Sequence, residues 1–153
     1  MPATVEFRPT GQGWADCTLG LGERTFTLTG ISDITDVFGD LTRLGLAIVT
    51  GAYRATASFD QEPVEWRIVA TSLMDAGGKG PVSIAVYEFA CVSDAQLSDG
   101  RFAFVGDCEA RDFARAVLHG VRNVLDNPEL RGFERFPPPT KALAALAFAL
   151  SEA

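Results

Sequence analysis

Only one histidine, His119, occurs among the 153 residues, and no Gly-x-Ser-x-Gly segment is present. A serine or cysteine triad needs a histidine beside its nucleophile, so the sequence offers little for nucleophilic catalysis. The three cysteines, Cys17, Cys91 and Cys108, lie far apart and none belongs to a Cys-x-x-Cys pair. That spacing is unlike a zinc site or a disulfide framework, and it is typical of a reducing compartment. We therefore expect no metal and no cofactor, and we interpret the cysteines as small core residues.

A long apolar segment and a surplus of basic residues are also lacking. The longest apolar run, residues 142–150, is too short to cross a bilayer, and no basic region followed by an apolar run opens the sequence. The formal net charge is −7. An acidic surface repels phosphate backbones and anionic lipid, so we expect neither a nucleic acid nor a membrane partner. These features together predict a cytoplasmic protein.

The patterns that are present belong to a globular α+β domain. The length fits one domain spanning 1–153, with 47% apolar and 22% charged residues. Alternating apolar and polar residues predict strands, and helical spacing predicts helices at 32–50 and 108–126 and a short one from Thr140. The predicted strands lie at 5–7, 15–21, 26–29, 53–59, 64–71, 82–89 and 102–105. Short turns favour antiparallel pairing. We expect two layers: a mainly antiparallel sheet of about six strands, with two main helices on one face and a short C-terminal helix.

The same periodicity predicts the core and the helix starts. Ser32 or Asp33 is expected to cap the first helix and Asp107 the second, because their side-chain oxygens can accept hydrogen bonds from the first turn. The residues expected to be buried are Phe38, Leu41, Trp66, Ile68, Ile84, Phe113, Val117 and Val121.

Acidic side chains are the main candidates for binding. Asp33, Asp36 and Asp40 share one side of the first predicted helix, and Glu62 and Glu65 flank the turn between two predicted strands. Each has a structural explanation as well, because carboxylates stabilise the positive end of a helix dipole and polar turns face water. The functional alternative is an acidic surface offered to a basic partner.

Two other groups of side chains could contact a protein. Arg54, Arg67 and Tyr87 are predicted to share the outward face of the sheet, and such residues often anchor interfaces. A basic stripe follows one side of the second predicted helix. It is expected to pair with carboxylates such as Asp112 and Asp126, or else to form a second contact surface. The stripe consists of Arg111, Arg115, His119 and Arg122.

Four features follow one another in chain order. They are Trp14 at the start of a strand, a Ser-Asp-Ile-Thr-Asp helix start at 32–36, the turn with Glu62 and Pro63, and Phe-Pro-Pro at 136–138 before a short last helix. In this order they resemble the small cytoplasmic immunity proteins of bacterial polymorphic toxin systems, particularly those related to the Wap-type immunity protein. The resemblance implies a non-enzymatic protein that binds and blocks a cognate toxin domain, often a nuclease.

The leading hypothesis is therefore occlusion of a basic toxin domain, with acidity speeding the encounter. One alternative is a small domain that binds a small molecule or a partner subunit, and another is an enzyme with paired carboxylates. The sequence leaves open whether the chain is a monomer or a homodimer. The candidate partner-binding residues are Trp14, Asp33, Asp36, Asp40, Glu62 and Glu65.

Overall fold

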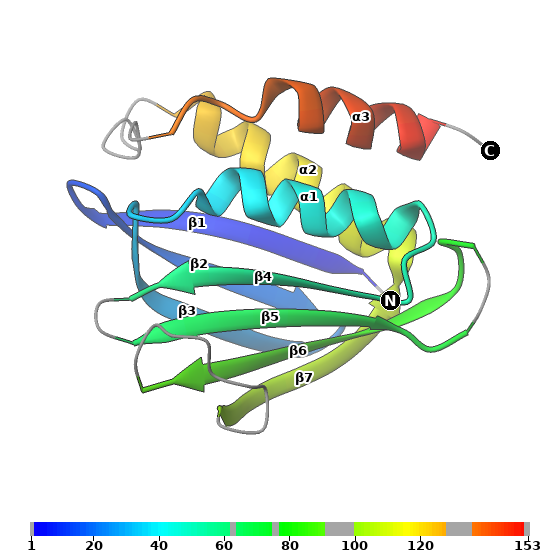
Figure 1. The fold of residues 1–153 in the computed structure, drawn as a ribbon, viewed down its shortest axis with the longest axis horizontal. Coiled ribbons are helices and arrows are strands. Elements are labelled where there is room, and N and C mark those ends of the chain that lie inside the picture. The colour runs from blue at the N-terminus through cyan, green and yellow to red at the C-terminus, as the bar shows by residue number, and fades with distance from the viewer. Residues whose placement is uncertain (1, 62–63, 75–76, 91–99, 128–135, 152–153) are drawn as a thin grey trace.

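The computed structural model describes residues 2–61, 64–74, 77–90, 100–127 and 136–151 (Figure 1). Within these residues the chain forms seven strands and three helices, which confirms the α+β class. The elements are β1 (Ala3–Gly11), β2 (Trp14–Leu21), β3 (Arg24–Ser32), α1 (Val37–Val49), β4 (Arg54–Asp60), β5 (Glu65–Ser72), β6 (Pro81–Phe89), β7 (Arg101–Glu109), α2 (Ala110–Leu125) and α3 (Thr140–Ser151).

The strands form two antiparallel sheets, one ordered β1-β2-β3 and the other β4-β5-β6-β7. The prediction of one sheet of about six strands is therefore wrong in its layout, although the antiparallel pairing is confirmed. The chain leaves the first sheet after β3, passes through α1, and starts a new sheet with β4. Beside β3, the indole N–H of Trp66 donates to the carbonyl of Thr29 at 2.9 Å. A side chain from β5 thus bonds the main chain of β3, and the two sheets remain separate.

The helices form two further layers on one side of the strands (Figure 1). α1 and α2 pack against each other and against the strands, and α3 lies over both of them. α2 approaches β1 closely because residue 120 is a glycine: a Cβ there would lie 2.5 Å from the carbonyl oxygen of Val5. Leu143 and Leu146 attach α3 to this layer with buried side chains.

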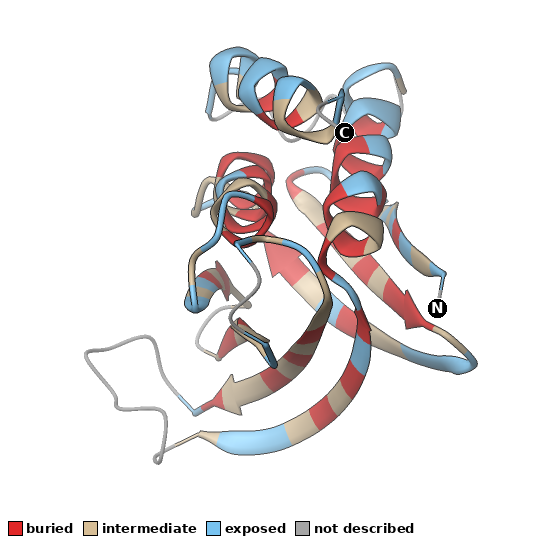
Figure 2. Cartoon of the chain, turned by 90° about the vertical axis from the view of Figure 1, so that its right-hand side faces the viewer, coloured by how far each residue is buried: buried red, intermediate tan, exposed pale blue. Residues whose placement is uncertain are grey.

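One apolar core is shared by both sheets and by α1 and α2. In Figure 2 buried positions alternate with less buried ones along the strands, and they are frequent in α1 and α2. Phe26 of β3 connects the sheets, because its ring stacks on Phe104 at 5.5 Å and meets Trp66 edge-on at 5.7 Å. All eight predicted core residues are buried, which confirms that prediction; they are Phe38, Leu41, Trp66, Ile68, Ile84, Phe113, Val117 and Val121.

Both main helices start later than expected. β3 continues through Ser32, and α1 begins at Val37 with Asp36 as its cap, so the predicted caps Ser32 and Asp33 are wrong. Asp36 accepts from the N–H of Gly39 at 3.2 Å. A Cβ at residue 39 would lie 2.1 Å from the Asp36 carboxylate, so the glycine makes room for the cap.

The second helix also lacks its predicted cap. β7 runs directly into α2, and Asp107 lies inside that strand rather than at the helix start. Glu109 occupies the cap position, and within the described residues its side chain makes no capping hydrogen bond.

Phe113→Ala tests the shared core. Phe113 is 0% exposed, so its truncation is expected to lower the free energy of unfolding by about 3–5 kcal/mol. The matched control is Phe148→Ala on α3, where the ring is 67% exposed and a change within about 0.5 kcal/mol is expected. Urea unfolding measures both, and a loss at Phe113 no larger than that at Phe148 would contradict the packing described.

Candidate partner-binding surface

Several turns lie together at one end of the molecule, at the left of Figure 1. The N–H of Asp33 donates to the carbonyl of Gly13 at 3.0 Å, which ties the segment before α1 to the β1–β2 turn. The N–H of Asp60, at the end of β4, contacts the hydroxyl of Thr35 at 3.4 Å. These contacts bring the segment with Asp33, Ile34 and Asp36 to the end of the molecule where β2 begins. We use the name acidic end for Trp14, Asp33, Ile34, Asp36 and Asp40.

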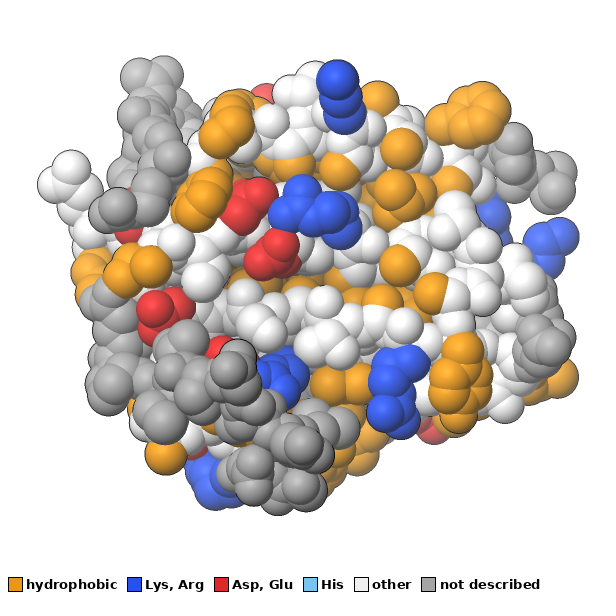
Figure 3. Space-filling model, in the orientation of Figure 1, with side chains coloured by type: hydrophobic (Ala, Val, Ile, Leu, Met, Phe, Trp, Pro, Cys, Tyr) orange, Lys and Arg blue, Asp and Glu red, His pale blue; other side chains and the backbone are white. Residues whose placement is uncertain are grey.

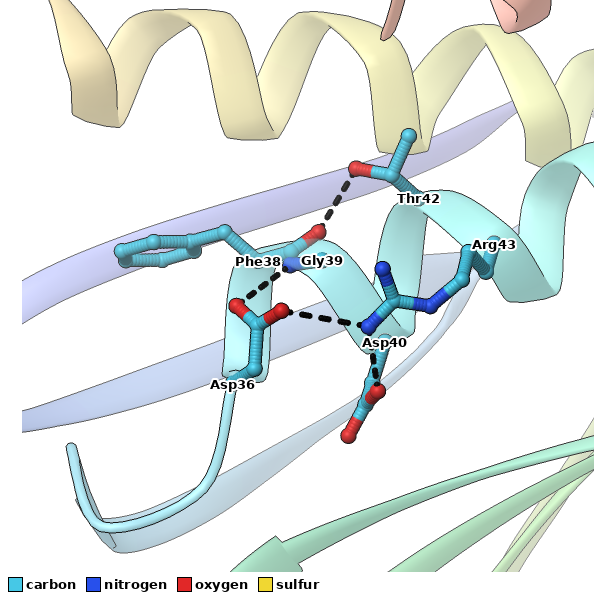
Figure 4. A network of polar contacts seen from close by, with 6 residues as sticks. All are labelled: Asp36, Phe38, Gly39, Asp40, Thr42 and Arg43. Atoms are coloured by element: carbon cyan, nitrogen blue, oxygen red, sulfur yellow. Dashed lines mark hydrogen bonds and ion pairs between the residues drawn. The ribbon is translucent and has the colours of Figure 1, made fainter. Parts of the chain in front are cut away.

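Arg43 sits between two of these carboxylates (Figure 4). Its Nη2 lies 2.7 Å from Asp40 Oδ1 and 3.1 Å from Asp36 Oδ2. The hydrogen bond with Asp40 raises the pKa of Arg43, the bond with Asp36 adds to this, and partial burial acts in the opposite direction. The charges of the two carboxylates and the one guanidinium add up to −1. This part of the surface is therefore less negative than its acidic residues alone suggest.

The acidic end also contains two apolar residues, Trp14 and Ile34. Trp14 is half-buried at the start of β2, opposite Ser32 at the end of β3. Ile34 is 43% exposed and lies two residues before the helix cap Asp36. The acidic end therefore combines charge with an accessible apolar part, and Ile34 was not among the residues predicted for binding.

The two glutamates of the predicted set do not join this surface. Glu62 lies outside the described residues. Glu65 is 5% exposed, and its Oε2 lies 2.6 Å from Arg67 Nη2. The guanidinium of Arg67 also lies 4.1 Å over the ring of Phe89. A carboxylate held in this buried ion pair is not available to a partner, so we leave Glu65 out of the candidate surface.

A second accessible surface is the outward face of the four-stranded sheet. Arg67 lies directly opposite Tyr87, and Arg54 lies on the same face opposite Thr71, which confirms the predicted sharing of this face. Phe102 is 56% exposed, and its ring contacts that of Tyr87 edge-on at 5.9 Å. The sequence alone did not identify Phe102, because alternation in a short strand does not show which face is covered.

The basic stripe on α2 is partly neutralised, as predicted. Arg115 pairs with Asp112 at 3.3 Å. Arg111 donates to the carbonyl of Ala149 at 3.5 Å, and it also bonds Leu150, so it satisfies main-chain acceptors near the end of α3. His119 is exposed.

The described residues contain no group of three or more histidine, cysteine or acidic side chains that could hold a metal ion. Burial raises the pKa of the Cys17 thiol to about 12 and is also the main cause of the same value at Cys108, where Asp112 contributes. Thiols with so high a pKa stay protonated near neutral pH and are poor nucleophiles. Cys91 lies outside the described residues.

An open groove of about 790 Å³ lies between the β2–β3 turn and β7. Leu21 and Val105 give it an apolar floor, and Arg24 and Asp107 supply charges of opposite sign. If the protein binds a small molecule instead, this groove is where that molecule would bind.

Comparison with known proteins finds no family model, no curated protein and no solved structure that matches this chain. In the parts of the chain that the structure describes, none of the helices has the length and apolarity needed to cross a membrane.

The buried thiols give a direct test of the core around them. At pH 9 a thiol with a pKa of about 12 is ionised in only about one molecule in a thousand, so Cys17 and Cys108 are expected to resist alkylation. Peptide mapping after iodoacetamide treatment measures this, with the protein in urea as the control in which both react. Equal labelling in the native and unfolded protein would contradict the burial.

Asp36 has a structural role that must be separated from binding. Asp36→Ala removes the α1 cap and is expected to cost about 0.5–2 kcal/mol of folding free energy. Asp36→Asn keeps the acceptor for Gly39, and Asp40→Asn alters only a surface ion pair, so both should stay within about 1 kcal/mol of the parent protein. Urea unfolding of the three variants decides this, and a loss from Asp36→Asn equal to that from Asp36→Ala would show that charge, not capping, stabilises the helix.

Proposed function

We propose that the chain is a non-enzymatic protein-binding domain that blocks a basic toxin domain, as its resemblance to bacterial immunity proteins implies. The observation that supports this proposal is the acidic end, where the segment with Asp33, Ile34 and Asp36 is tied to the β1–β2 turn by the bond from Asp33 to Gly13. The mechanism is occlusion, in which this surface covers the partner's active site.

Charge and apolar contact have separate tasks in this mechanism. A nuclease must present basic groups to hold phosphate, and an acidic partner with a net charge of −7 is drawn to it over a long range. Steering of this kind raises the association rate, whereas short-range contacts set the lifetime of the complex. Ile34 and Trp14 are the groups at the acidic end that can make such apolar contacts.

Arg43 orders the two carboxylates of the acidic end without neutralising both of them. By bonding both Asp36 and Asp40 it fixes the two carboxylates in one arrangement before a partner arrives. Side chains that are already ordered lose less conformational entropy on binding. A guanidinium of the partner can then form ion pairs with carboxylates that are already held in place.

The runner-up is binding of a small molecule in the groove between the β2–β3 turn and β7, favoured by its volume of about 790 Å³ and its mixed lining. Pockets for small ligands are typically concave and mostly apolar, with a few placed polar groups.

Replacing Asp33, Asp36 and Asp40 by asparagine tests the acidic end. The change removes three negative charges with little change in volume, and asparagine still caps α1. Association with a cognate basic toxin domain is expected to slow by roughly tenfold or more at low salt, and the difference should shrink at high salt as the charges are screened. Stopped-flow binding across a salt series measures both effects.

The matched control removes three charges elsewhere, with Glu6→Gln, Glu23→Gln and Asp107→Asn, all at exposed positions. This control makes the net charge less negative by the same three units. It should slow association less than the variant at the acidic end does. Equal slowing by both triple variants would mean that only the net charge matters, and the acidic end would lose its role. Failure of the parent protein to bind any toxin domain encoded beside its gene would reject the immunity function itself.

A further inference from the structure

The last strand of the four-stranded sheet, β7, is an edge strand whose main chain alternates between β6 and the outside. The N–H of Ala110 donates to the carbonyl of Gly80 at 2.9 Å, across an opposite pair that continues the β6–β7 register. In an antiparallel ladder such hydrogen-bonded pairs recur at every second residue. The N–H and C=O groups of Val105 and Asp107 therefore point away from β6, and in the described part of the chain no turn, loop or side-chain hydrogen bond takes them up.

This side of β7 is open. Three consecutive residues, Val105, Gly106 and Asp107, line the groove of about 790 Å³ between the β2–β3 turn and β7. Because successive side chains of a strand point to opposite faces, a groove that touches three in a row follows the edge of the strand. A Cβ at residue 106 would lie 2.9 Å from Leu21 Cδ1, so Leu21 packs closely against this part of β7 and forms the floor. Asp107 is exposed and Val105 is half-buried.

We propose that this groove binds one extended segment of a protein partner, which adds to β7 as a further antiparallel strand. Val105 and Asp107 exchange main-chain hydrogen bonds with two residues of the segment, and the residue between these two packs on Leu21. In strand addition the main-chain bonds supply affinity and the side-chain contacts supply sequence preference. A small molecule could contact Leu21 without using the unbonded main-chain groups, so these groups favour a peptide as the occupant.

The charges and apolar groups beside the edge define the chemistry of the segment. Val105 and Asp107 are two residues apart and project from the same face of the sheet. An antiparallel segment therefore carries, in chain order, a basic residue opposite Asp107, an apolar residue over Leu21 and a β-branched residue opposite Val105. Glu23 and Arg24 at the rim offset each other, so Asp107 sets the sign of the charge that the groove prefers.

Charge also disfavours a second copy of this chain as the occupant. Two copies each carry a net charge of −7 and repel each other over a long range, whereas a basic segment is attracted. On the face shown in Figure 3, the Lys and Arg side chains are scattered rather than gathered into a basic patch.

The groove is separate from the acidic end. β2 begins at Trp14, in the acidic end, and finishes at Leu21, in the groove (Figure 1). The eight residues of β2 span roughly 25 Å. A partner in the groove and a toxin domain at the acidic end therefore occupy different surfaces, and this inference goes beyond the proposed function.

An N-methylated peptide gives the sharpest test. The probe is Thr-Thr-Lys-Val-Val-Thr-Thr with both ends blocked, which sets its Lys opposite Asp107 and its second Val opposite Val105. NMR titration is expected to give a Kd below about 1 mM, with the largest amide shifts at Val105 and Asp107. N-methylation of the second Val removes a donor to β7 and should weaken binding by about tenfold. N-methylation of the first Val, whose N–H points away from β7, is the matched control and should change the Kd by less than about twofold.

Val105→Pro tests the same bonds from the side of the protein. Proline removes the Val105 N–H, which points into the groove, so no hydrogen bond to β6 is lost. Val105→Thr keeps the N–H and should bind the probe like the parent protein, whereas Val105→Pro should bind it about tenfold more weakly. If circular dichroism shows that Val105→Pro fails to fold, Asp107→Lys replaces it. That variant should weaken binding by about fivefold, and a probe with Glu in place of Lys should recover the loss.

Several outcomes would overturn the proposal. They are an absence of saturable binding to the parent protein, amide shifts away from the groove, equal effects of the two N-methyl groups, and no recovery by the Glu probe. Sedimentation that shows a parent dimer which Val105→Pro dissociates would also overturn it, because the edge would then belong to a second copy. These measurements use no toxin domain, so they stand or fall separately from the proposed function.

Discussion

The two sheets are joined by side chains rather than by a main-chain ladder, and Trp66 lies at the centre of this junction. Its indole bonds the Thr29 carbonyl of β3, and its ring meets Phe26, which in turn stacks on Phe104 of β7. β3 and β4 approach each other near this junction, yet they belong to separate sheets. The same junction brings the end of β4 to Thr35 and so fixes the segment before α1, where the acidic end lies.

Periodicity predicted the elements well because it reports which face of a strand or helix is buried. Every strand foreseen from alternation is present, and the eight predicted core residues are buried. Periodicity does not report which strands become neighbours, and this is why one sheet was expected where there are two. The choice depends on contacts such as that between Trp66 and Thr29, which join residues far apart in the sequence.

The candidate surface was predictable only in part, for a similar reason. The spacing of Asp33, Asp36 and Asp40 indicated one side of a helix, and they do lie at one end of the molecule. The ion pairs of Arg43 with Asp36 and Asp40 follow from spacings of seven and three residues, a signal that was present and unused. The burial of Glu65 had no such signal, because an outward position on a strand is normally solvated.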